Sequence, residues 1–169
     1  MQMIKILLLF IIFILSNFIG KIIAGKYRYR LEELQEIKNA MSILKTKIKF
    51  TYEPIPEIFL EISNNLNTNI SKIFKNAKEK MESKNAGQAW EEAVLDSTSN
   101  LNKEDKKVLV MMSKMLGRTD VDGQISQIDV TLNFLDKQIE EALYERNKNE
   151  KLYKKLGTIL GLALVIILV

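Results

Sequence analysis

The chain contains no cysteine and no histidine, and only two of its 169 residues are proline. Without cysteine, it can form neither a disulfide framework nor a thiolate nucleophile. Without histidine, it lacks the commonest general base and a very common metal ligand. The seven glycines are scattered, so a glycine-rich phosphate-binding loop is absent as well. Serines and lysines are numerous, which leaves a serine–lysine nucleophile pair open, but no spacing favours one.

The chain also has only a small excess of positive charge, with a formal net charge of +4. Nucleic-acid binding would require a basic stripe or an aromatic platform, and the sequence contains neither. A calcium loop that began at Asp120 would need glutamate at its twelfth position, and that position is Thr131. Asp120 and Asp122 are therefore expected to lie in the first turn of a helix, where the helix dipole favours acids.

Residues 120–169 show the clearest pattern in the chain. Apolar residues recur there every three or four positions, which is the spacing of one helical stripe. A basic segment follows, and residues 156–169 carry no charge. The pattern predicts one helix that first packs against other helices and then ends in a membrane. The stripe is Val121, Ile125, Ile128, Leu132, Leu135, Ile139 and Leu143, and the basic segment holds Arg146, Lys148, Lys151, Lys154 and Lys155.

Residues 1–25 form a second apolar segment, which is expected to be an uncleaved transmembrane anchor. A bilayer requires a helix of about 20 residues, and residues 3–23 reach that length if Lys21 extends its ammonium group to the interface. A cleavable signal peptide is the alternative, which the lack of a small-x-small cleavage site disfavours. The segment 156–169 is shorter, about 21 Å at 1.5 Å per residue, so it either gains Leu152 and Tyr153 or enters the membrane without crossing it.

The basic residues beside both apolar segments lie on the side of the central residues. The positive-inside rule therefore predicts that residues 26–155 are cytoplasmic and that both termini lie outside the cytoplasm. The first of the two basic clusters is Lys21, Lys26, Arg28 and Arg30.

Residues 26–155 are expected to form one all-α domain, a bundle of about six helices between the two membrane helices. Alternation of period two never persists, so no strand is predicted. An apolar stripe over residues 31–50 predicts an amphipathic helix continuous with the anchor. Residues 108–112 are apolar nearly all round, which predicts a fully buried helix. The stripe of the first helix is Leu31, Leu34, Ile37, Met41, Leu44 and Ile48.

Turn and cap signals divide the bundle. Pro56 suits the first turn of a helix, and Asn102 with Asp105 predicts a capped helix start. Gly117 suits a left-handed helix end. Thr119 with Asp122 is expected to cap the last helix in the same way as Asn102 with Asp105.

Three sets of residues are candidates for contacts. Glu53, Glu57 and Glu61 recur every four residues, so their charges repel one another; they form either a solvated or lysine-paired face or a contact strip for a basic partner. Small residues four apart in the two apolar segments either allow close packing of membrane helices or occur by chance in segments that tolerate glycine. The single tryptophan, Trp90, is expected to be a core residue packed beside residues 108–112. The small-residue pairs are Gly20 with Ala24 and Gly157 with Gly161.

Five motifs together point to a known family: Tyr29-Arg30-Leu31-Glu32-Glu33-Leu34; residues 48–58 with Tyr52 and Pro54; Ala89-Trp90; Met115-Leu116-Gly117 followed by Asp120 and Gln124; and Lys151-Leu152-Tyr153-Lys154-Lys155-Leu156-Gly157. Their order and spacing extend over essentially the whole chain. On these motifs, the chain resembles the stage III sporulation protein AB family of endospore-forming bacteria.

The resemblance implies a cytoplasmic domain similar to that of the inner-membrane platform proteins of type II secretion and type IV pilus systems. Such proteins are not enzymes; they couple a cytoplasmic secretion ATPase to a membrane-embedded assembly. The implied assembly is the channel between mother cell and forespore in the engulfment membranes, with other stage III sporulation proteins as partners. The resemblance supplies no catalytic, cofactor-binding or metal-binding residue. Platform proteins usually have two such domains, so a chain with one is expected to restore the count by forming a homo-oligomer.

An enzyme of the membrane surface that uses carboxylates alone is the alternative function. It would require two acids facing each other in a pocket, with the pKa of one raised by burial. The absence of histidine, cysteine and a phosphate loop favours the scaffold.

Overall fold

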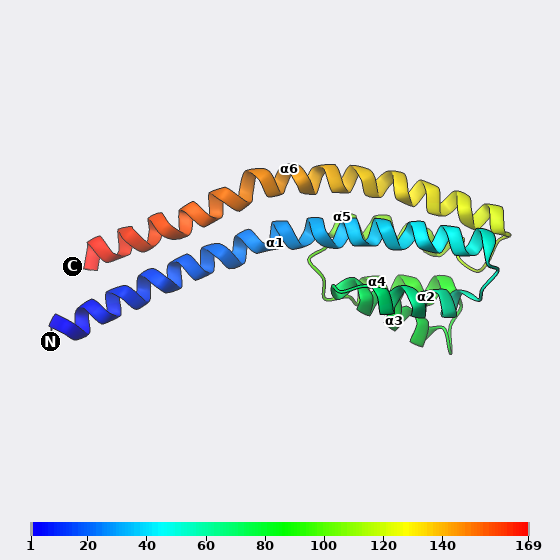
Figure 1. Cartoon of the computed structure of the whole chain (residues 1–169), viewed down its shortest axis with the longest axis horizontal. Helices are drawn as coiled ribbons and strands as arrows, with labels where there is room; N and C mark the ends of the chain where they lie inside the picture. The colour runs from blue at the N-terminus through cyan, green and yellow to red at the C-terminus, as the bar shows by residue number, and fades with distance from the viewer. Residues whose placement is uncertain (1, 169) are drawn as a thin grey trace. The chain divides into compact units, whose positions relative to one another are not determined.

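The computed structural model describes residues 2–168, and these residues form helices and connections with no strand among them (Figure 1). The all-α class and the six α-helices agree with the sequence analysis. The terminal residues Met1 and Val169 of the two expected membrane segments lie outside the described part. The elements are α1 (Gln2–Phe50), α2 (Ile55–Asn65), α3 (Asn69–Lys80), α4 (Ala86–Leu95), α5 (Lys103–Met111), the 3₁₀ helix η1 (Met112–Lys114) and α6 (Val121–Leu168).

The chain forms two compact units, and each is described here by itself. Unit 1 consists of Met1–Leu31 and Glu141–Val169, and unit 2 consists of Glu32–Glu140. Unit 1 therefore contains both expected membrane segments together with residues 26–31 and 141–155. Helices α1 and α6 each continue without a break from one unit into the other.

The core of unit 2 is built on the predicted stripe of α1 and on three aromatic rings. Leu34, Ile37, Met41 and Leu44 are fully buried. The rings of Phe59, Phe74 and Trp90, from α2, α3 and α4, lie with their centroids 5.2–5.5 Å apart in edge and tilted arrangements. Such geometries are favourable for aromatic pairs beyond the area that they bury.

Two glutamates of α1 hold the loops that join the shorter helices. Glu33 accepts hydrogen bonds from the backbone N–H of Asn100 at 2.7 Å and from its side-chain amide at 2.8 Å. Glu36 accepts from the backbone N–H of Asn67 at 3.2 Å and from the hydroxyl of Thr68. Since Thr68 is also the N-cap of α3, Glu36 fixes the residue that starts that helix.

The helix ends are as predicted at three places and differ at one. Pro56 lies in the first turn of α2, and Asn102 with Asp105 forms a capping box at the start of α5. Gly117 has a φ of +69°, the left-handed conformation for which glycine has no steric cost. The predicted cap of α6 by Thr119 and Asp122 is wrong: the Asp120 carboxylate accepts from the N–H of Gly123 at 3.0 Å, because the helix begins one residue later than that capping pair requires.

Two predicted buried faces are narrower than expected. Around α5, Val108, Leu109 and Met112 are buried, whereas Val110 and Met111 are half-exposed, because the outer side of this short helix is not covered. On α6, Ile128 and Leu135 of the predicted stripe are buried, and Leu143 is exposed. Thr131 also lies on the buried face of α6. Its hydroxyl donates to Gln127 O at 2.9 Å, so this buried polar group has a hydrogen-bond partner without water.

Candidate functional site

In unit 1, α1 and α6 approach each other at the predicted small residues. A Cβ atom added to Gly20 would lie 2.9 Å from Gly157 Cα, and one added to Gly157 would lie 3.0 Å from Gly20 Cα. A Cβ on Gly161 would lie 2.9 Å from the ring of Phe13, and Ala24 is fully buried. The four small residues thus lie at or near the contact between the helices, where any larger side chain at Gly20 or Gly157 would meet backbone.

Polar side chains join the same two helices. Ser16 Oγ donates to Gly157 O at 2.7 Å, and Thr158 Oγ1 donates to Asn17 Oδ1 at 2.7 Å. Hydrogen bonds between helices favour association in lipid, where water does not compete for the polar groups. Ser16 and Asn17 interrupt an otherwise apolar segment of the sequence, which is a signal for a helix contact that the predicted site residues do not include.

An aromatic pair and an ion pair also join α1 and α6, farther from the N-terminus than Gly20. The rings of Tyr27 and Tyr153 stack with centroids 5.8 Å apart, and partial burial together with a hydrogen bond to Tyr153 raises the pKa of Tyr27. The buried guanidinium of Arg30 pairs with Glu145 at 2.6 Å. Glu145 is 36% exposed, so the pair is only half-buried and water screens part of its attraction.

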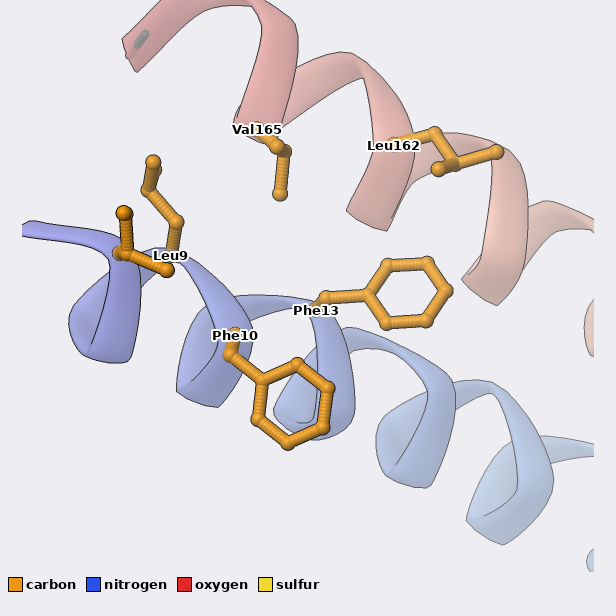
Figure 2. Close-up of a pocket in the computed structure, with 6 residues that line it drawn as sticks. Leu9, Phe10, Phe13, Leu162 and Val165 are labelled. Atoms are coloured by element: carbon orange, nitrogen blue, oxygen red, sulfur yellow. The ribbon is translucent and has the colours of Figure 1, made fainter.

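Two apolar grooves run between α1 and α6 in unit 1. One, of about 300 Å³, is drawn in Figure 2, where Phe13 and Leu162 extend from facing helices. The other, of about 500 Å³, includes Gly20 and Gly157 in its lining. Most large apolar side chains of residues 3–22 are exposed, which is expected for a surface that meets lipid. The first groove is lined by Ile6, Leu9, Phe10, Phe13, Leu162 and Val165.

Among the described residues, one helix has the length and apolar composition needed to cross a membrane. This is the helix within Met3–Phe50, and its apolar window lies near the N-terminus. Helix α6 does not meet the same criterion in the described part, so the second span that the sequence analysis expects is not shown. The described structure therefore supports one membrane anchor.

The acidic strip, Glu53, Glu57 and Glu61, begins just before α2, continues along that helix, and is partly neutralised. Lys47 of α1 pairs with Glu53 at 3.1 Å and with Glu61 at 2.5 Å, and these hydrogen bonds raise the pKa of Lys47. The expected repulsion along the strip is thus reduced, because Lys47 lies between two of its carboxylates. Glu57 is exposed, and Leu60, between Glu57 and Glu61 on the same helix face, is 43% exposed.

A second charged surface, which the sequence analysis missed, lies along α5. The positions 103, 106, 107, 110, 111 and 114 have helical spacing, and together with α4 they line an open groove of about 500 Å³. We call it the basic groove, because lysines surround its apolar floor. Its spacing was readable in the sequence, but the apolar run at 108–112 suggested that the whole helix was buried. The lining residues are Glu91, Leu95, Lys103, Lys106, Lys107, Val110, Met111 and Lys114.

No arrangement among the described residues points to catalysis. Within residues 2–168, no three of His, Cys, Asp and Glu come together as a group that could hold a metal ion. None of the three pockets described above contains two acids. The acids with shifted pKa values, Glu92 and Glu150, have them lowered by hydrogen bonds from lysines. The carboxylate-only enzyme therefore lacks a supporting observation.

Comparison with known proteins gives a consistent result over the whole chain. A model of the family described as stage III sporulation protein AB matches residues 5–169. Stage III sporulation protein AB of Bacillus subtilis (strain 168) is 26% identical over 170 residues, which cover 98% of this chain and 99% of that protein. A solved structure of stage III sporulation protein AB (SpoIIIAB) matches with a TM-score of 0.66 at 22% identity, covering 71% of this chain and 98% of that chain. At this identity, the structural match shows a shared fold.

Proposed function

The chain belongs to the stage III sporulation protein AB family, and from this membership we propose that it is a non-enzymatic platform subunit of a sporulation channel. It links a cytoplasmic secretion-type ATPase to the channel between mother cell and forespore. Its place is the engulfment membrane of the mother cell, and its other partners are further stage III sporulation channel proteins. The role is that of inner-membrane platform proteins in type II secretion systems.

The observation that carries this proposal is that α1 and α6 each contribute to both units. The same two helices supply the close pair of unit 1 and part of the buried core of unit 2. Continuous helices therefore join the membrane anchor to the folded bundle, with no separate linker between them. A platform needs this combination, because it must remain in the membrane while a soluble ATPase binds to it.

The C-terminal part of α6 is the second membrane segment in this proposal. The hydrogen bonds of Ser16 and Asn17 and the close contact of Gly20 with Gly157 hold it against the anchor. A segment held this way need not insert by its own hydropathy, since the pair buries its polar groups together. Both termini then lie outside the cytoplasm, and unit 2 lies inside.

Co-purification from sporulating cells tests the proposed function. The full-length chain, carrying an affinity tag, is extracted from mother-cell membranes in mild detergent, and the bound proteins are identified. We expect a secretion-type ATPase and other stage III channel proteins to be enriched over an unrelated tagged membrane protein. Purified ATPase should then bind the full-length chain reconstituted in lipid nanodiscs. An ATPase that binds empty nanodiscs equally well would contradict the platform role.

A further inference from the structure

Two exposed surfaces of unit 2 are complementary in charge. The basic groove has an apolar floor bordered by lysines, and the acidic strip has exposed Leu60 between Glu57 and Glu61. We propose that the acidic strip of one copy docks into the basic groove of a second copy. This inference goes beyond the platform function, and its measurement involves no ATPase.

The basic groove is suited to an acidic helix with an apolar centre. Two of its four lysines are available: among the described residues, neither Lys103 nor Lys114 has an ion-pair or hydrogen-bond partner, whereas Lys107 pairs with Glu104 at 2.7 Å. Lys106 is held in place by the carbonyl oxygens of Leu95 and Ser97 at 3.2 and 2.8 Å. The floor contains Met111, whose flexible thioether side chain adapts to an incoming surface, and Leu95, which is 56% exposed.

The acidic strip has the matching features. Glu57, Leu60 and Glu61 follow the i, i+3, i+4 spacing that places side chains on one helix face, while Ile58, Phe59 and Ile62 are buried on the opposite face. Helix-in-groove recognition uses the same spacing of anchors. Lys47 is shared between two of the three carboxylates, so the strip remains net negative.

Within one copy, the two surfaces do not pair. Helix α2 packs on α3, α3 packs on α4, and α4 packs on α5. No described ion pair joins the strip to a groove lysine. A contact between different surfaces of two copies is heterologous, and it leaves one strip and one groove free for further copies. The result is a ring if the rotation closes and an open chain if it does not.

Charge exchange on the full-length protein tests the proposal. The chain has no cysteine, so Ser83→Cys, at an exposed position, accepts a single donor or acceptor dye. Self-association is measured by energy transfer between labelled copies in vesicles of neutral phosphatidylcholine. Lys103→Glu with Lys114→Glu reverses the groove, and Glu57→Lys with Glu61→Lys reverses the strip. Lys72→Glu with Lys75→Glu, on the exposed face of α3, is the control with the same charge change as the groove variant.

We expect each reversal alone to weaken association about tenfold at low salt, since opposed charges become like charges. The α3 control should leave it unchanged. An equal mixture of groove-reversed and strip-reversed copies should restore it, because each then offers the surface that the other requires. Added salt should weaken the association of the unmodified chain, as it does for pairs at an exposed rim.

Restoration by the mixture is the decisive result. If both reversals weaken energy transfer but the mixture does not recover it, the strip is not the occupant of the groove and the proposal is wrong. If the groove reversal leaves energy transfer unchanged and instead weakens binding of purified ATPase, the groove takes the ATPase. Equal helical content by circular dichroism in all variants shows that the reversals act at the surface.

Discussion

At the scale of single residues, Trp90 joins the helices of unit 2. Its side chain is fully buried against Phe59 and Phe74, and its indole N–H donates to Leu109 O at 2.8 Å. The residue therefore fills space and satisfies a backbone carbonyl of α5 at the same time. Tryptophan suits this position because it combines a large apolar body with one donor.

Replacement of Trp90 by a small residue should destabilise the fold. We expect Trp90→Ala to lower the free energy of unfolding by about 3–5 kcal/mol, through the cavity that it leaves and the lost hydrogen bond. Chemical denaturation of the full-length chain in detergent, followed by circular dichroism, measures the change. Leu95→Ala, at a largely exposed position of the same helix, is the control and should have little effect. An unchanged denaturation midpoint for Trp90→Ala would contradict a core role.

Glu92 links pH to the stability of α4. Hydrogen bonds from Lys84 and then Lys80 lower the pKa of its carboxyl below the usual value of 4.5. The ionised form is favoured in the folded state, so its contribution is present above pH 4.5 and is lost as the pH falls through the lowered pKa. We expect Glu92→Gln to reduce the acid-induced loss of thermal stability below pH 4.5. Melting temperatures of both chains between pH 3 and 6 test this, and parallel pH curves would disprove it.

At the scale of elements, local patterns were predictable and contacts between distant segments were not. The capping box of Asn102 and Asp105 and the left-handed Gly117 depend on neighbouring residues, so spacing alone predicted them. The pairing of Lys47 with Glu61 depends on how α2 packs on α1, and no local spacing encodes it. The basic groove was missed for a related reason, because only the packing of α5 decides which side of an apolar run stays exposed.

The pairing of α1 and α6 is the element contact most sensitive to a single side chain. Gly157→Ile should separate the helices, because the new side chain would meet Gly20 Cα and Ser16 O at 3.0 Å, and backbone cannot move aside as a flexible side chain can. Asn17→Cys with Thr158→Cys reports the contact through disulfide formation in membranes. We expect the crosslink to form readily in the parent and to fall severalfold with Gly157→Ile.

A control at Gly25 separates this effect from a general intolerance of larger residues. A Cβ atom at Gly25 would meet only the ring of Tyr29, at 3.2 Å. Gly25→Ala should therefore leave the crosslink unchanged. Equal crosslinking in the Gly157→Ile variant would show that the close approach of Gly20 and Gly157 does not hold the pair together.

At the scale of the whole molecule, membership of the family was predictable from ordered motifs along the chain, and the full-length match confirms it. The arrangement across a membrane stays a prediction, because it depends on charge flanking rather than on a contact. Lys21, Lys26, Arg28 and Arg30 precede the bundle, and five basic residues between positions 146 and 155 follow it. By the positive-inside rule, cations on both flanks favour a cytoplasmic position for residues 26–155.

Thiol labelling in intact cells tests this arrangement, since a chain without cysteine gives no background. We expect Ser83→Cys, exposed between α3 and α4, to resist a membrane-impermeant maleimide until the cells are permeabilised. Gln2→Cys, which precedes the expected span of residues 3–23, should react in intact cells and serves as the matched control. Labelling of Ser83→Cys before permeabilisation would reverse the orientation, and the ATPase could then no longer reach unit 2 from the cytoplasm. The platform function therefore depends on this result.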